Sequence, residues 1–141
     1  MKKFEILLQK LKWIDLIAPS REELNLLSSE LNIPSRILIN ALDPEHLPKY
    51  ELFDSTAVIY LRTIDTSKQA ANNILDLTTK ITLIIKEDII ISIHRLDHPF
   101  IEELRNEALE KNYILKDLIK KIVTSALLSF ELPLIKLEER V

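Results

Sequence analysis

The chain has 141 residues and a net charge of −3, with 47% hydrophobic and 29% charged residues, a balance typical of a water-soluble globular protein. It contains no cysteine and no glycine, which excludes disulfide frameworks, thiolate chemistry and the glycine-dependent phosphate loops of most nucleotide enzymes. The acidic balance argues against nucleic acid as the main partner, and no stretch reaches the roughly 20 apolar residues of a membrane-spanning helix.

The length suits one domain with a core of its own. We predict a single soluble domain over residues 1–141. Residues 1–98 are expected to be mainly sheet with two short helices, and residues 99–141 are expected to be helical. This division rests on the change from β-branched runs in the first part to an apolar period of 3.6 residues after Pro99.

The first part of the chain predicts strands and two short helices before a polar stretch. Strands are expected where apolar and β-branched residues gather, at 4–9, 13–16, 50–53 and 57–62. Ser20 and Glu23 have the spacing of a capping box, in which each side chain accepts a hydrogen bond from the other residue's backbone N–H. The box predicts a helix that starts there, and a second short helix is expected at 35–42. The polar stretch 63–73 is the predicted mobile loop.

Two isoleucine-rich runs, 81–85 and 89–93, form the centre of the predicted fold. Both are dominated by β-branched residues, which favour strands, and neither alternates cleanly with charged residues, so both faces are expected to be covered. We therefore predict a hairpin at the centre of a sheet, with helices packed on it. Because tight primed turns need a positive φ that Glu87 or Asp88 would adopt only with strain, a looser type I turn is expected.

After the hairpin the apolar residues recur with the period of a helix. One helix is expected just after Asp97 or His98, either of which is placed to cap it, and a second starts at Leu115. From 125 to 137 the second helix has almost no polar face, so something must cover it. Pro133 is expected to kink it or to start a new segment. We interpret the end of the chain as a truncation or as a surface that meets partner chains.

The histidines and two aromatic residues are candidates for binding or catalysis. His94 and His98 are four residues apart, a spacing that on a helix suits a transition metal. Because His94 ends a predicted strand and His98 precedes a proline, a structural or exposed role is favoured. His46 lies in a loop without a serine or cysteine partner, so no enzyme is predicted. Trp13 and Tyr50 are expected to pack rather than to stack on a ligand.

The carboxylates that fall in predicted loops or at strand ends form the more informative set. They are Asp43, Glu45, Asp54, Asp65, Glu87 and Asp88. Hard cations such as Mg²⁺ prefer oxygen ligands and keep much of their water, so one or two loop carboxylates can form a weak site, above all at a subunit interface. Most of these side chains are expected simply to be solvated.

The order of the predicted pieces resembles a known family. The pieces are the Trp13-Ile14-Asp15 strand, the Glu22-Glu23 helix, Ile33-Pro34 before a short helix, the segment 45–51 before two paired strands, the isoleucine-rich hairpin, and a long helix over 118–137. Over nearly the whole chain this order resembles the cytoplasmic N-terminal domain of CorA-type magnesium and cobalt transporters, a family that includes zinc-transporting relatives.

The resemblance implies an α/β fold with a mixed central sheet sandwiched between helices, ending in a long C-terminal helix that leads toward a stalk this chain lacks. It also implies a regulatory, ion-sensing domain on the cytoplasmic face of the membrane, assembled as a homopentamer in the full-length protein. In that family, acidic residues at protomer interfaces bind Mg²⁺ and hold the pore shut. By its position after the strand at 58–62, Asp65 matches the sensor carboxylate. The weak regulatory ion is expected to be Mg²⁺, with Co²⁺ or Zn²⁺ as alternatives.

The chain departs from the family in its pore. The Gly-Met-Asn signature is absent, since there is no glycine and Met1 is the only methionine, and both membrane helices are missing. As given, the chain cannot conduct an ion, and it is expected to meet the membrane only through the missing C-terminal helices. The alternative is a free-standing α/β interaction module that binds a partner helix against the apolar surface at 125–137.

Overall fold

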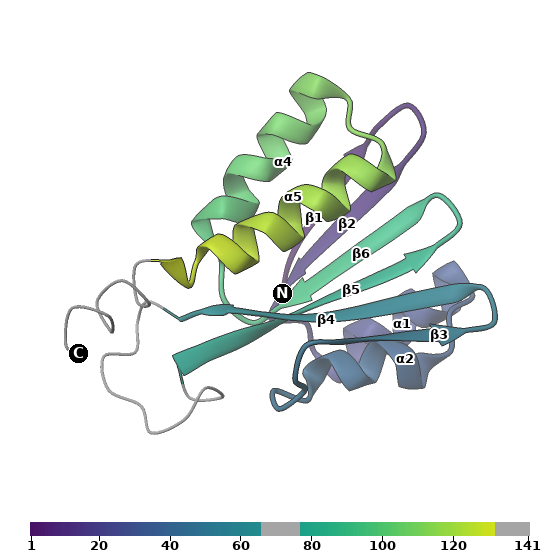
Figure 1. Cartoon of the computed structure of the whole chain (residues 1–141). Coiled ribbons are helices and arrows are strands. Elements are labelled where there is room, and N and C mark those ends of the chain that lie inside the picture. The colour runs from purple at the N-terminus through teal and green to yellow at the C-terminus, as the bar shows by residue number, and fades with distance from the viewer. Residues whose placement is uncertain (66–76, 132–141) are drawn as a thin grey trace.

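A six-stranded sheet in the order β1-β2-β6-β5-β4-β3 runs through the middle of the molecule (Figure 1). The structure is a computed structural model, and it describes residues 1–65 and 77–131. All neighbouring strands are antiparallel except β2 and β6, which are parallel. The strands are β1 (Lys2–Leu7), β2 (Lys12–Ile17), β3 (Lys49–Phe53), β4 (Thr56–Ile64), β5 (Thr78–Lys86) and β6 (Ile89–His94).

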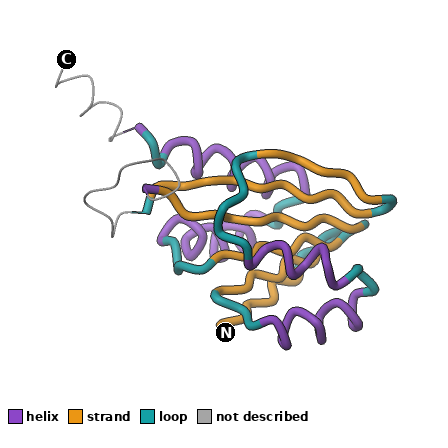
Figure 2. Tube along the Cα trace, turned by 90° about the horizontal axis from the view of Figure 1, so that it is seen from below, coloured by secondary structure: helices purple, strands orange, loops and turns teal. Residues whose placement is uncertain are grey.

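Helices lie on both faces of this sheet (Figure 2). The helices are α1 (Arg21–Leu31), α2 (Ser35–Ile39), the 3-10 helix η1 (Asn40–Leu42), α4 (Pro99–Lys111) and α5 (Leu115–Leu128). The predicted α/β fold, a mixed sheet between helices, is therefore confirmed. Within residues 1–65 and 77–131, none of the helices has the length and apolarity that crossing a membrane would take.

Alternate residues of the central strands point into two separate cores. Trp13 and Leu83 belong to the core that α4 and α5 cover, whereas Ile14 and Ile84 belong to the core that α1 and α2 cover. Each such side chain contributes about 1.5–3 kcal/mol by burial, so apolar residues on both faces of the strands stabilise the fold. This explains why the isoleucine runs show no alternation with charged residues. The predicted hairpin is confirmed, because β5 and β6 pair antiparallel in the middle of the sheet.

The hairpin turn differs from the prediction. Lys86 pairs with Ile89, which leaves a two-residue turn, and Glu87 has a φ of 52°. A type I turn has negative φ at both central residues, so the expectation of a looser type I turn is wrong. A type I turn in a two-residue hairpin would splay the strands, because its twist does not match theirs, and the strained φ is held in place by the pairing on either side. The turn between β3 and β4 repeats the pattern, with a φ of 35° at Asp54.

Asparagine takes the place of glycine where two helices end. Asn32 after α1 and Asn112 after α4 have left-handed φ values of 54° and 49°. Their backbone N–H groups donate to the carbonyls of Ser28 and Ala108, which closes each helix end. Asparagine tolerates this conformation better than other residues with a Cβ, so a chain without glycine can still end its helices sharply.

Several boundaries and exposures also differ from the predictions. Thr63 and Ile64 belong to β4 rather than to a loop, because β4 pairs with β5 along its full length; the rest of the predicted mobile loop, 66–73, lies outside the described residues. Trp13 packs as predicted, but Tyr50 on the edge strand β3 is 62% exposed, so the expectation that it packs is wrong. The helix expected at 35–42 is divided between α2 and η1.

The last helix is described only in part. α5 ends at Leu128, and the predictions for Pro133 and for the apolar surface beyond residue 131 lie outside the described residues. Leu127 and Leu128 are exposed, whereas Ala126 is buried against the sheet.

The capping box at the start of α1 is formed as predicted. Glu23 N–H donates to Ser20 Oγ over 3.1 Å, and Ser20 N–H donates to a Glu23 carboxylate oxygen over 3.0 Å. We expect Ser20→Ala to lower the free energy of unfolding by about 1 kcal/mol in urea denaturation. The substitution removes the hydroxyl that accepts from the Glu23 N–H and so breaks the reciprocal pair of hydrogen bonds. Glu22→Gln, which changes a first-turn acid outside the box, is the matched control and should cost only a few tenths as much. Equal losses would show that the box itself adds nothing.

Candidate functional site

One edge of the sheet gathers the ends of several strands. Because β4 and β6 each run antiparallel to β5, and β2 runs parallel to β6, the ends of β2, β4 and β6 lie beside the start of β5 (Figure 1). Backbone hydrogen bonds hold the chain just past these ends, from Ala18 N–H to His94 O over 2.8 Å and from Asp65 N–H to Leu77 O over 2.9 Å. Asp65, which follows β4, and His94, which ends β6, lie at this edge.

Asp65 stands apart from the other carboxylates that the sequence singled out. It is 4% exposed, whereas the other five, Asp43, Glu45, Asp54, Glu87 and Asp88, are exposed and thus solvated as expected. Its Oδ2 lies 4.0 Å from Nη2 of Arg95, the residue directly after β6, whose side chain is largely exposed. Within the described residues no group of three or more histidines or acids is arranged to hold a metal ion, so the role of Asp65 as a metal ligand stays a prediction.

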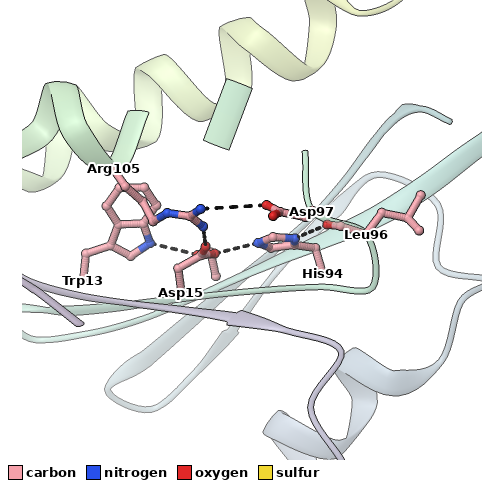
Figure 3. Close-up of polar contacts among 7 residues, drawn as sticks. Trp13, Asp15, His94, Leu96, Asp97 and Arg105 are labelled. Carbon is pink, nitrogen blue, oxygen red and sulfur yellow. Dashed lines mark hydrogen bonds and ion pairs between the residues drawn. The ribbon is translucent and has the colours of Figure 1, made fainter. Parts of the chain in front are cut away.

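Asp15 is the centre of a buried charge network on the α4 side of the sheet (Figure 3). Its Oδ1 accepts from Ser92 Oγ over 2.5 Å and faces His94 Nε2 at 2.6 Å. Its Oδ2 accepts from Nη1 of Arg105, which reaches down from α4, over 2.5 Å. Trp13 Nε1 donates to Ser92 Oγ over 2.8 Å. The indole therefore orients the Ser92 hydroxyl, which in turn donates to the Asp15 carboxylate. The network joins β2, β6 and α4 through one side chain.

The hydrogen bonds of His94 define its protonation state. Its Nδ1 lies 2.5 Å from the carbonyl oxygen of Leu96, which can only accept, so Nδ1 carries a proton. Burial opposes the charge of Asp15, but hydrogen bonds and charge from His94, followed by Ser92 and Arg105, together lower the pKa of this carboxyl, so it is ionised and also only accepts. Nε2 must therefore carry a proton too, and His94 is a buried imidazolium. Both ring nitrogens of His94 are thus used in hydrogen bonds within the fold, as a structural role requires.

His98 lies next to this charge and is kept neutral. It is the N-cap residue of α4, its ring centroid is 5.5 Å from that of His94, and it is 6% exposed. Within the described part of the chain its Nε2 has no hydrogen-bond partner. Burial, followed by repulsion from His94, lowers the pKa of His98 from 6.5 to about 4. The two neighbouring histidines thus differ in their contacts, because each ring nitrogen of His94 faces an acceptor whereas His98 Nε2 has none among the described residues.

Sequence reasoning missed this network. The partners of Asp15 lie 77, 79 and 90 residues away along the chain, so no local spacing brings them together. The available signal was Asp15 itself, a carboxylate in the otherwise apolar strand Trp13-Ile14-Asp15-Leu16-Ile17. A carboxylate buried in a strand must be paired, and a histidine and an arginine were the partners to look for.

Comparisons with known proteins agree with the fold. The complete CorA magnesium transporter from Methanocaldococcus jannaschii matches with a TM-score of 0.73 and 24% identity over 92% of this chain and 41% of that one. The soluble domain of CorA from the same organism matches with a TM-score of 0.72 and 22% identity, over 93% of this chain and 52% of that one. The ZntB cytoplasmic domain from Vibrio parahaemolyticus matches with a TM-score of 0.73 and 19% identity, over 93% of this chain and 53% of that one.

These similarities establish the fold, and the chain spans about half or less of each matched protein. No curated protein sequence matches the chain. The family model described as CorA-like Mg²⁺ transporter protein matches residues 8–141, nearly the whole sequence. The chain therefore belongs to the CorA-like Mg²⁺ transporter family.

Proposed function

We propose that this chain is the cytoplasmic regulatory domain of a CorA-like divalent-cation transporter, and that it senses the ion through Asp65. The match of residues 8–141 to the family is the observation that carries the proposal. Mg²⁺ is the proposed ion, with Co²⁺ or Zn²⁺ as alternatives. In the whole protein the domain forms part of a homopentamer and reaches the membrane through further segments. The domain itself is neither the conducting part nor an enzyme.

The donor set suits an ion that is shared between chains. Mg²⁺ keeps several of its waters and is commonly bound through only one or two carboxylates. The described residues of one chain offer no ligand group of three or more, so a single protomer would supply little more than Asp65. A weakly held ion between the Asp65 carboxylate and an acid of a neighbouring protomer fits both facts.

Electrostatics then links the ion to the packing of protomers. Two carboxylates about 4 Å apart repel each other by about 4 kcal/mol at an effective dielectric constant of about 20, and a divalent cation between them turns this repulsion into attraction. The contact between Asp65 and Arg95 spans 4.0 Å and involves an exposed arginine, and the cation would take the place of this arginine beside the carboxylate. Ion occupancy would bias the assembly toward the state in which the two carboxylates are close.

The experiment is a thermal-unfolding titration with Mg²⁺ on the full-length protein. A site that is occupied at about 100 times its dissociation constant stabilises the folded state by about 2.7 kcal/mol, so wild-type protein should unfold at a clearly higher temperature with Mg²⁺. Asp65→Asn should lose this response. Asp88→Asn, which removes the same charge from an exposed turn, should keep it. A response shared by both variants would exclude Asp65 as a ligand, and no response in any protein would reject the sensing function.

A second candidate function is the free-standing module that binds a partner helix. The exposed Leu127 and Leu128 favour it, since they are large apolar side chains in the described part, 125–131, of the surface predicted at 125–137. The two candidates differ in the parent reading frame. A frame that continues into two apolar spans supports the transporter domain, whereas a stop codon after Val141 supports the module.

A further inference from the structure

An open pocket of about 240 Å³ lies on the sheet edge described above, and His94 is among its lining residues. It is lined by the loop after β2, by η1 and the loop that follows it, by the start of β5 and by the end of β6. Its walls are mostly apolar, formed by Pro19, Leu42, Pro44 and Ile93 among others. Drug-sized ligands fill pockets of about 300–1,000 Å³, so this cavity suits a smaller molecule.

Two cations line the same cavity, Lys80 and Arg95. Lys80 is 7% exposed, and its ammonium donates to Asn40 O over 3.0 Å and to His46 Nδ1 over 2.8 Å. An ammonium has three N–H donors, so these two contacts leave one for a ligand. Within residues 1–65 and 77–131 no carboxylate reaches ion-pair distance of Lys80. A buried charge of this kind is costly unless an anion accompanies it.

The surroundings of Lys80 are positive rather than neutral. Arg62 stands directly opposite Lys80 on β4, and like charges in such a cross-strand pair repel each other. The pKa of Lys80 is lowered to about 8, mainly by burial; Asp43 acts in the opposite direction, and the charge of Arg62 adds to the lowering. Asp43 is exposed, accepts a hydrogen bond from the backbone N–H of Glu45, and forms no direct ion pair with Lys80 among the described residues.

His46 holds the ammonium in place. Its ring stacks on Tyr60 with centroids 4.2 Å apart, and the Lys80 ammonium lies 5.1 Å from the centroid of the same Tyr60 ring. Because Lys80 can only donate, His46 Nδ1 accepts, so this histidine is neutral. Burial, followed by repulsion from Lys80, lowers the pKa of His46, which favours the neutral form of this histidine. The ammonium of Lys80, a residue that lines the cavity, is thus held by the neutral groups Asn40 O and His46 Nδ1.

We propose that this cavity binds a small organic anion, whose carboxylate or phosphate group contacts Lys80 and Arg95 and whose apolar part contacts Pro19, Leu42, Pro44 and Ile93. The anion would supply the missing negative charge beside a buried ammonium and fill an apolar space at the same time. Arginine adds a planar pair of donors that suits carboxylate and phosphate oxygens, and its exposed position lets it close over the ligand. The site shares Arg95 with the surroundings of Asp65, but its other proposed contacts do not involve the ion-sensing role.

The test is an NMR titration of the ¹⁵N-labelled chain with four probes: phenyl phosphate, benzoate, phenol and inorganic phosphate. At least one of the two aromatic anions should shift the backbone amides of Ala18 and Thr79, which line the cavity, and should bind at least about tenfold more tightly than phenol. The stronger of the two identifies the preferred head group. Tighter binding than inorganic phosphate shows that the apolar wall contributes.

Variants locate the charge. Lys80→Met and Arg95→Gln should each weaken anion binding by about tenfold, whereas Lys86→Met, at the far end of the same strand, should leave it unchanged. If Lys80→Met does not fold, the exposed Arg95→Gln still decides the question. The proposal is overturned if neither anion binds, if phenol binds equally well, or if both cavity variants bind like wild type.

Discussion

Replacing Asp15 with alanine is expected to lower the free energy of unfolding by about 3–5 kcal/mol, a large share of the roughly 5–15 kcal/mol that stabilises a domain. The substitution leaves the Arg105 guanidinium and the His94 imidazolium in the core without the carboxylate that both contact. It also removes the acceptor of Ser92 and so releases the anchor of Trp13. Urea denaturation followed by Trp fluorescence measures the loss, because Trp13 is the only tryptophan.

Asp97 provides the matched control for this prediction. Its Oδ1 lies 3.8 Å from the same Arg105, but its side chain is 39% exposed, so Asp97→Ala should cost less than about 1 kcal/mol. If Asp15→Ala fails to fold, Asp15→Ala combined with Arg105→Met should recover part of the stability by removing one uncompensated charge. Similar costs for Asp15→Ala and Asp97→Ala, or no recovery in the double variant, would contradict the role of the network.

Acidification is expected to destabilise the fold through His98, by about 3 kcal/mol between pH 6.5 and pH 4. The folded state keeps His98 neutral down to a pKa of about 4, whereas the unfolded chain binds the proton at its ordinary pKa of 6.5. Between these two values the unfolded state holds more protons, so the unfolding free energy falls as the pH falls. One pKa unit corresponds to about 1.4 kcal/mol, which gives the expected size. The full stability is present above pH 6.5.

His98→Phe separates this effect from the titration of carboxylates. Phenylalanine keeps a ring beside His94 and Phe100 but cannot take up a proton. Denaturation of both proteins at a series of pH values gives two stability curves, and their difference cancels the groups that they share. The curve of the variant should stay flatter between pH 6.5 and pH 4. Parallel curves would show that His98 is not the buried group that resists protonation.

The sequence predicted those parts of the fold that depend on neighbours along the chain. The capping box of Ser20 and Glu23 needs only a spacing of three residues, and the hairpin needs only two β-branched runs close together. The predicted type of the hairpin turn was wrong because the pairing of buried strands, a tertiary effect, outweighed the local cost of a positive φ at Glu87. The prediction that Tyr50 packs was wrong for a related reason, since its exposure depends on β3 being an edge strand.

The sites depended on contacts that no spacing reveals. Asp65 could be singled out by its place after a strand, but its burial beside Arg95 could not, because the two residues are 30 positions apart and meet only through the order of the sheet. The same holds for Lys80 and His46, which come from a strand and a distant loop and meet over 2.8 Å. The family resemblance was enough to predict the fold, whereas the positions of the charged side chains relative to one another became known only from the structure.

The ion-sensing role of Asp65 is tested most directly by the thermal-unfolding temperature of the full-length protein with and without Mg²⁺. An increase in the wild type and in Asp88→Asn that is absent from Asp65→Asn is the result expected if Asp65 binds the ion. An increase of the same size in Asp65→Asn would contradict it.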